Sequence, residues 1–194
     1  MKKRLSVIIT VLVSVVSSCV FFVTPLKAQL VFPLIVNTTS DTVVAGACQQ
    51  GNPQPGCSLR GAIQRANEAA NNDLIIIAIP ESSDPNCVAG VCTINLTGLL
   101  PNISGPVSIT GPGADKLTVR RNTGGNYGVF IALTTIGSVN FSGLTISNGV
   151  VSSGGGIFHS GSGTVNVTNC TLSNNTATGN SASNGAAFAM PPAH

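Results

Sequence analysis

One repeated pattern constrains the fold of this chain more than any other feature. Residues 138–149 (SVNFSGLTISNG) align with residues 164–175 (TVNVTNCTLSNN) at an offset of 26 in the numbering. In both segments apolar residues alternate with polar ones, the alternation slips by one position at Gly143 or Asn169, and it then resumes. Because Gly and Asn tolerate a left-handed backbone, each segment is predicted to form two short strands joined by a bend.

The apolar positions of the two segments correspond one to one. They are Val139, Phe141, Leu144 and Ile146 in the first segment, and Val165, Val167, Cys170 and Leu172 in the second. Cys170 takes the position of a leucine in this row, so it is predicted to be a small buried apolar side chain with an unpaired thiol.

Weaker copies of the pattern flank these two segments. Residues 106–111 align with the start of the first segment at an offset of 32, and residues 184–188 repeat residues 154–158 at an offset of 30. Repeats of roughly 25 to 30 residues predict an all-β parallel solenoid, whose coils bury their inward residues only against one another. An antiparallel sandwich of the same strands is the alternative, but it gives no reason for the repeat.

A single helix is predicted ahead of the strands. In the stretch CSLRGAIQRAN (57–67), Ser58 is a good N-cap, and an apolar stripe with helical spacing follows it. The stripe consists of Leu59, Ala62, Ile63, Ala66 and Ala70. The first coil of a solenoid exposes its apolar interior and unpaired strand edges, so we expect a helix over 58–70 to cover that end.

The segment 1–28 resembles a secretory signal peptide. A basic start precedes an apolar run over 5–23, and a small residue, Ala28, precedes Gln29, so cleavage is predicted after Ala28. Two alternatives stay open, an uncleaved membrane anchor and a bacterial lipoprotein acylated at Cys19. Apart from such a signal peptide or an anchor missing from this sequence, no membrane association is expected.

Export places the cysteines in an oxidising compartment. Cys48 and Cys57 then close one short loop, and Cys87 and Cys92 close another, so we predict two disulfides. Zinc binding is the alternative, but neither pair has the spacing of a zinc ribbon or finger, and both histidines lie far away in the sequence. No metal and no other cofactor is expected.

Most of the apparent basicity of the chain belongs to the signal peptide. Four of the nine Lys and Arg side chains lie within 1–28, so five face six carboxylates in the remainder. A remainder without a basic excess, and without tryptophan, is not expected to bind nucleic acid.

The stretch CSLRGAIQRAN also carries a resemblance to a known family. It resembles the signature of the CSLREA-type N-terminal domain, which in exported bacterial proteins precedes right-handed parallel β-helix repeats of the pectate-lyase-like fold. The resemblance continues through residues 36–42, 75–80, 100–106 and 109–114 and covers nearly all of 34–188. It implies a right-handed parallel β-helix with an N-terminal capping helix.

One residue departs from the family pattern. Gly61 stands where the family usually has Glu, three positions after Ser58, so the reciprocal capping-box contact cannot form. Loss of this contact and the low helix propensity of Gly are expected to cost roughly 1 kcal/mol.

The charged residues can be compared with the sites of enzymes that share this fold. Pectate lyases and related hydrolases use paired or calcium-binding carboxylates on the outer face. This chain has no carboxylate over 116–194, and no two of its carboxylates have the spacing of strand neighbours. The densest charged cluster, Asp115-Lys116 with Arg120-Arg121, is interpreted as a solvated turn and strand face.

Three further residues are possible site residues. His159 follows a glycine turn and is expected to be exposed, without a catalytic partner. Arg60 and Arg65 lie on the polar flank of the predicted helix, where we expect them to pair with Glu68 or with solvent rather than bind an anion at the helix N-terminus.

Together these patterns predict an exported, non-enzymatic β-helix protein. The expected order is a signal peptide (1–28), a cap segment (29–72) and β-helix coils (73–194), truncated at the C-terminal end. Rows of Ser, Thr and Asn on the outer face would bind an extracellular glycan or a surface protein, in adhesion or surface structure. The alternative function is a polysaccharide lyase or glycoside hydrolase, which rests on analogy of fold alone.

Overall fold

The computed structural model describes residues 32–52, 54–69, 73–179 and 188–189. These residues form mostly short strands and one short helix, so the all-β expectation is confirmed. The signal peptide, its cleavage site after Ala28, and Ala70 lie outside the described residues.

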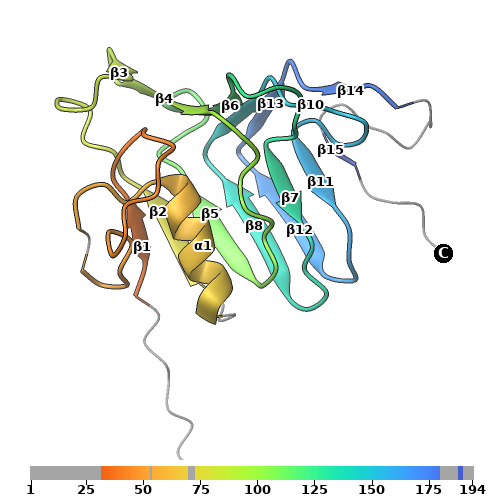
Figure 1. Cartoon of the computed structure of the whole chain (residues 1–194), viewed down its shortest axis with the longest axis horizontal. Helices are drawn as coiled ribbons and strands as arrows, with labels where there is room; N and C mark the ends of the chain where they lie inside the picture. Colours follow the sequence, from red (N-terminus) through yellow and green to blue (C-terminus); the bar gives the residue numbers. More distant parts are fainter. Residues whose placement is uncertain (1–31, 53, 70–72, 180–187, 190–194) are drawn as a thin grey trace, which may run out of the picture.

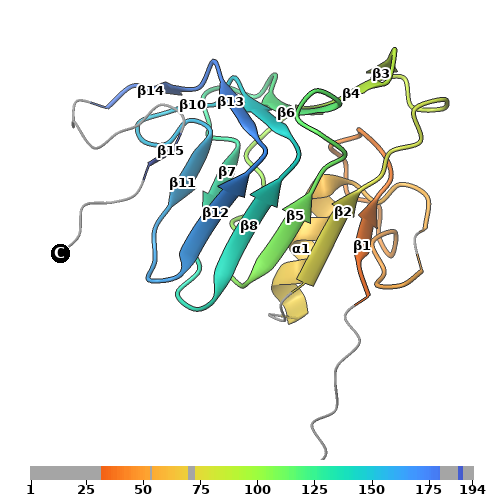
Figure 2. The ribbon, with the colours of Figure 1, turned by 180° about the vertical axis from the view of Figure 1, so that it is seen from behind.

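The largest parallel sheet runs the length of the molecule. Its strands lie in the order β1, β2, β5, β8, β12, and every neighbouring pair is parallel. Figure 2 shows these strands side by side, with the helix behind β2. The bounds are Leu34–Val36 for β1, Asp73–Ile77 for β2, Val107–Thr110 for β5, Ser138–Ser142 for β8 and Thr164–Thr168 for β12.

A second five-stranded sheet has the order β13, β9, β6, β4, β3. Its pairs are parallel except for the antiparallel β3–β4 hairpin. The bounds are Cys87–Val88 for β3, Val91–Leu96 for β4, Leu117–Arg121 for β6, Thr145–Ser147 for β9 and Thr171–Ser173 for β13.

Two smaller parallel sheets complete the arrangement (Figure 1). One has the order β15, β11, β7, and the other pairs β10 with β14. The bounds are Phe130–Ala132 for β7, Val150–Val151 for β10, Ile157–His159 for β11, Thr176–Ala177 for β14 and Phe188–Ala189 for β15.

The strand register follows two of the three repeats seen in the sequence. Val139 pairs with Val165, as the offset of 26 predicts, and Val107 pairs with Val139, as the offset of 32 predicts. The third repeat is wrong by one position, because Ile157 pairs with Phe188. The sequence between the two aligned segments is rich in Ser, Asn and Gly, a composition in which an alignment by residue type is easily displaced by one position.

The predicted bends are confirmed by the backbone. Gly143 and Asn169 have φ angles of 66° and 52°, which lie in the left-handed region. An added Cβ at Gly143 would lie 2.6 Å from the carbonyl oxygen of Gly111 in the neighbouring turn. Glycine is therefore required at this bend both for its backbone angle and for the close approach of the next segment.

Helix α1 (Leu59–Ala69) lies against the first two strands of the large sheet (Figure 1). Ser58 caps it, because its Oγ accepts a hydrogen bond of 3.1 Å from the backbone N–H of Gly61. The described residues of the apolar stripe are all buried in the core that also contains β1 and β2, namely Leu59, Ala62, Ile63 and Ala66.

A disulfide joins Cys48 to Cys57 and fixes the loop before α1 to the start of the helix. It also gives a structural reason for glycine at position 61. An added Cβ at Gly61 would lie 3.1 Å from the Cys48 sulfur, closer than most side chains approach. Gly61 therefore weakens the helix but makes room for the disulfide beside it.

Candidate functional site

The outer face of the second sheet carries a row of four threonines. Thr93, Thr118, Thr145 and Thr171 occupy the same register position on β4, β6, β9 and β13. They alternate with apolar residues that point inward, so their side chains lie on the outer side of the sheet. Adjacent strands lie about 4.8 Å apart, so the row repeats one hydroxyl group at this spacing. We call this set the threonine row.

The hydroxyl groups of the threonine row differ in what they bind. The Thr145 hydroxyl donates to the backbone oxygen of Ala114 at 2.6 Å. Among the described residues, the hydroxyls of Thr93, Thr118 and Thr171 make no side-chain hydrogen bond, and Thr171 is exposed. At least these three hydroxyls are available to an external ligand.

A second polar column lies beside the threonine row. It contains Asn95, Arg120, Ser147 and Ser173, which are again aligned across β4, β6, β9 and β13. Arg120 Nε donates to Asn95 Oδ1 at 2.7 Å, so the amide holds the guanidinium group against the sheet. The column therefore places one positive charge among hydroxyl and amide groups.

The large sheet carries comparable polar columns on its outer face. Asn166 Nδ2 donates to Asn140 Oδ1 at 2.8 Å, and Asn140 Nδ2 donates to Ser108 Oγ at 3.0 Å. In the neighbouring column Ser142 Oγ donates to Thr110 Oγ1 at 3.2 Å. These side chains bind mainly one another, which stiffens the face and leaves fewer free groups than the threonine row has.

Sequence reasoning missed the threonine row as a site. It predicted outward rows of Ser, Thr and Asn, but it named no residues on the second sheet. The signal is present in the sequence, because the position numbers of successive members of the row differ by 25, 27 and 26. Because the spacing varies, the four threonines can be aligned only when the lengths of the turns between the strands are known.

The charged cluster predicted at 115–121 is spread over β6 and the turn before it. Lys116 precedes β6 and lines a small cavity of about 60 Å³ together with Glu81. At the other end of the strand, Arg121 donates to the backbone oxygens of Asn148 at 2.6 Å and Gly125 at 3.1 Å. Asp115 is exposed in the turn. The interpretation as a turn and strand face agrees with these positions.

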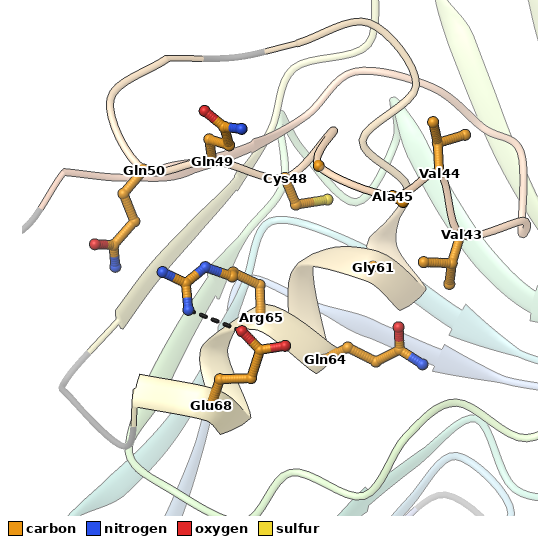
Figure 3. Close-up of a pocket in the computed structure, with 11 residues that line it drawn as sticks. Val43, Val44, Ala45, Cys48, Gln49, Gln50, Gly61, Gln64, Arg65 and Glu68 are labelled. Carbon is orange, nitrogen blue, oxygen red and sulfur yellow. Dashed lines mark hydrogen bonds and ion pairs between the residues drawn. The ribbon is translucent and has the colours of Figure 1, made fainter.

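A cavity of about 600 Å³ lies between α1 and the loop that precedes it (Figure 3). Gly61 and Cys48 lie on its lining, and polar side chains line it elsewhere. Arg65 pairs with Glu68 at 2.9 Å, one of the two pairings expected from the sequence, and their side chains are 42% and 67% exposed. Gln49, Gln50 and Gln64 are the remaining polar lining residues.

A buried carboxylate contacts Gln50, one of the residues that line this cavity. Asp73 is 1% exposed, and its Oδ1 accepts a hydrogen bond of 2.7 Å from Gln50 Nε2. Its Oδ2 has no partner among the described residues. Burial raises the pKa of Asp73, although the positive charge of Arg65 and the Gln50 hydrogen bond oppose the shift. Asp73 is not on the cavity lining, so the two features do not combine into one site.

Arg60 is not an anion site, and its expected partner was wrong. It donates to Asp41 Oδ1 from Nε at 3.0 Å and to Asp41 Oδ2 from Nη2 at 2.8 Å. It also donates to the backbone oxygens of Gly98 and Leu99. Asp41 in turn accepts 2.8 and 2.9 Å hydrogen bonds from the backbone N–H and hydroxyl of Thr97. Arg60 and Asp41 together connect α1, the loop before it and the end of β4.

Asp84 is also used structurally. Its carboxylate accepts hydrogen bonds from the backbone N–H of Thr39 at 2.8 Å, from the Thr39 hydroxyl and from the Asn86 backbone at 3.1 Å. Burial acts to raise the pKa of Asp84, but these hydrogen bonds and one from Thr38 outweigh it and hold the pKa below its usual range. The loop at 84–86 is thereby fixed to the segment after β1.

Two expectations about single residues were wrong. His159 is 4% exposed rather than exposed, because it takes an inward position on β11 opposite Ala132. Cys170 is half-buried rather than buried, and its thiol is unpaired. His159 follows the inward alternation of β11, whereas Cys170 directly precedes β13, which has a neighbouring strand on one side only.

The other disulfide expected from the sequence joins Cys87 to Cys92 across the β3–β4 hairpin. No helix among the described residues is long and apolar enough to cross a membrane. No family model, curated protein or solved structure matches this chain. Its class is therefore given by its fold and surface alone: over the described residues it is an all-β protein with one helix, two disulfides and aligned polar rows on its outer faces.

Proposed function

We propose that the chain is a right-handed parallel β-helix whose first coil is covered by α1, as the resemblance to CSLREA-type domains implies. Support comes from the parallel, in-register pairing of strands that belong to successive sequence repeats, such as Val139 with Val165 and Val107 with Val139. The right hand is supported by the strong preference of parallel crossovers for that hand.

The protein is further proposed to work outside the cytoplasm, secreted or on the cell surface. Two disulfides in a chain of this size are typical of an oxidising compartment. The basic and apolar start of the sequence, with cleavage after Ala28, supplies the export route.

The proposed function is binding of an extracellular glycan or surface protein, in adhesion or in surface structure, without catalysis. The threonine row carries this proposal. Hydroxyl groups repeated at one fixed spacing on a rigid sheet suit a ligand that is itself periodic, and a glycan is periodic in its own hydroxyl groups.

A glycan array with the purified full chain tests the proposal. The variant Thr93→Val/Thr118→Val removes two free hydroxyls while keeping shape and strand propensity, and it is expected to weaken binding to every ligand that the wild type retains. Thr178→Val, at an exposed threonine outside the row, is the matched control. Binding that both variants retain in full would contradict a ligand site on the threonine row.

The same samples test the enzymatic alternative. Acidic and neutral polysaccharides are incubated with the protein, with and without calcium, and new reducing ends or unsaturated products are measured. Turnover that disappears in Asp115→Ala would replace the binding proposal by a polysaccharide lyase or hydrolase.

A further inference from the structure

The position of Arg120 narrows the class of ligand. We propose that the face formed by β4, β6, β9 and β13 binds a linear polysaccharide that bears carboxylate or sulfate groups, with Arg120 contacting the anionic group. This inference rests on the proposed glycan-binding function and adds the charge of the ligand to it.

Arg120 combines free terminal donors with a charge that no carboxylate among the described residues neutralises. Arg60 is neutralised by Asp41, Arg65 is paired with Glu68, and Arg121 donates to two backbone oxygens. Arg120 uses only Nε, in its hydrogen bond to Asn95, and within the described residues no carboxylate lies within ion-pair distance of it. Its two terminal NH₂ groups can therefore bind a carboxylate or sulfate in the bidentate manner typical of arginine.

The surroundings of Arg120 favour a carbohydrate. The threonine row runs beside it, and Ser173 in its own column is half-buried, whereas Ser147 between them is only 6% exposed and is not available to a ligand. Four strands extend the face over about 14 Å, enough for several sugar units of an extended chain. Sugar hydroxyls can then bind the threonine row while an anionic substituent on the same unit or a neighbouring one reaches Arg120.

Nucleic acid fits this face less well. Binding the phosphate backbone requires several cations along the path of the strand, and single strands also stack their bases on aromatic side chains. The two columns contain one cation and no aromatic side chain, and Tyr127, the sole tyrosine of the chain, is buried. A sparse anionic charge on a hydroxyl-rich polymer is the better complement.

Three cellulose derivatives with one backbone test the inference. Hydroxyethyl cellulose is neutral, carboxymethyl cellulose carries carboxylates and cellulose sulfate carries sulfates. Affinity of the full chain is measured by biolayer interferometry at low and physiological salt. We expect the two anionic polymers to bind, more weakly as salt rises, and the neutral polymer to bind at least about tenfold more weakly. The preferred anionic polymer identifies the substituent.

Variants locate the contact. Arg120→Gln is expected to lower affinity for the anionic polymers at least about tenfold without changing affinity for the neutral one. Arg120→Lys keeps the charge and is expected to restore part of the loss. Arg65→Gln on α1 removes the same charge from another surface and serves as the matched control, while circular dichroism and thermal unfolding check that each variant folds.

Other outcomes overturn the inference in distinguishable ways. In the first, all three polymers bind in a way that depends on Thr93 and Thr118 but not on Arg120. This result would keep the proposed glycan-binding function and remove the requirement for an anionic group. Equal loss in Arg65→Gln, or equally tight Arg120-dependent binding of duplex DNA, would reveal a general attraction for polyanions. Binding that neither the arginine nor the threonine variants alter removes both proposals.

Discussion

The large sheet ends in two edge strands that bury the same kind of residue to different degrees. On β1, Leu34 and Val36 are both 0% exposed, because α1 and the loop before it cover this edge. On β12, Val165 is half-buried and Val167 is 37% exposed. In β8, the neighbour of β12, Val139 and Phe141 occupy the same register positions and are 0% and 1% exposed.

This difference teaches that alternation decides which way a side chain points, whereas burial depends on what lies on both sides of its strand. An edge strand has a neighbouring strand on one side only, so its inward residues stay partly exposed unless another element covers that edge. At the β1 end that element is α1, held by the Cys48–Cys57 disulfide and by the ion pair of Asp41 with Arg60. The β1 end should therefore be more sensitive to substitution than the β12 end.

The largest expected effect is a charge in the covered end. Ile63→Asp places a carboxylate at a side chain that is 2% exposed, without a partner, and is expected to cost more than about 4 kcal/mol and to unfold or aggregate the protein. Val167→Asp makes the same chemical change at the β12 edge and is expected to cost less than about 1 kcal/mol. Thermal unfolding and size-exclusion chromatography measure both, and equal losses would remove the distinction between the two ends.

The next effect concerns the ion pair that fixes α1. Asp41→Ala leaves the largely buried Arg60 without its partner and deprives Thr97 of its acceptor, so we expect a loss of about 3 kcal/mol. Glu68→Ala breaks the exposed pair with Arg65 on the same helix and is expected to change stability by less than about 0.5 kcal/mol. The free energy of unfolding of both variants is measured in urea. A similar loss in both would mean that Arg60 does not hold α1 in place.

A smaller effect depends on pH. The pKa of Asp73 is raised by burial, so the folded protein holds this proton more tightly than the unfolded chain does. The stability that Asp73 contributes is thus fully present below its unfolded pKa and is lost as the pH rises through its folded pKa. We expect Asp73→Asn to gain stability relative to the wild type as the pH is raised from about 4 to about 7.

The pH dependence from Asp84 has the opposite sign. Its pKa is lowered in the folded protein, so the stability that it contributes is lost as the pH falls. Both proteins contain Asp84, so its contribution cancels when the two are compared by urea unfolding at each pH. A stability difference that stays constant over this range would show that Asp73 keeps its ordinary pKa.

The smallest effect concerns Gly61. In the reduced protein Gly61→Ala is expected to stabilise α1 by about 0.5 to 1 kcal/mol through helix propensity. With the disulfide intact the new Cβ meets the Cys48 sulfur at 3.1 Å, so the gain should shrink or reverse. Unfolding measured with and without reductant separates the two contributions, and an equal gain in both states would mean that the disulfide tolerates the methyl group.

Most of the strands could be predicted from the sequence, but the threonine row of the candidate site could not. Sequence reasoning aligned Val139 with Val165 correctly, but it paired Phe158 rather than Ile157 with Phe188. It also did not predict β1 as part of the large sheet. Very short strands carry too little alternation to be recognised, and turns of variable length move the register without leaving a local signal.

What the sequence alone determined are features set by neighbouring residues. Alternation defines the two faces of each strand, Ser58 and the apolar stripe define α1, and short loops bring Cys48 to Cys57 and Cys87 to Cys92. The tertiary structure alone decided the threonine row, the pairing of Arg60 with Asp41 and the burial of His159. These depend on which residues of distant segments come into register, and that is fixed by the packing of all the strands together rather than by any one segment.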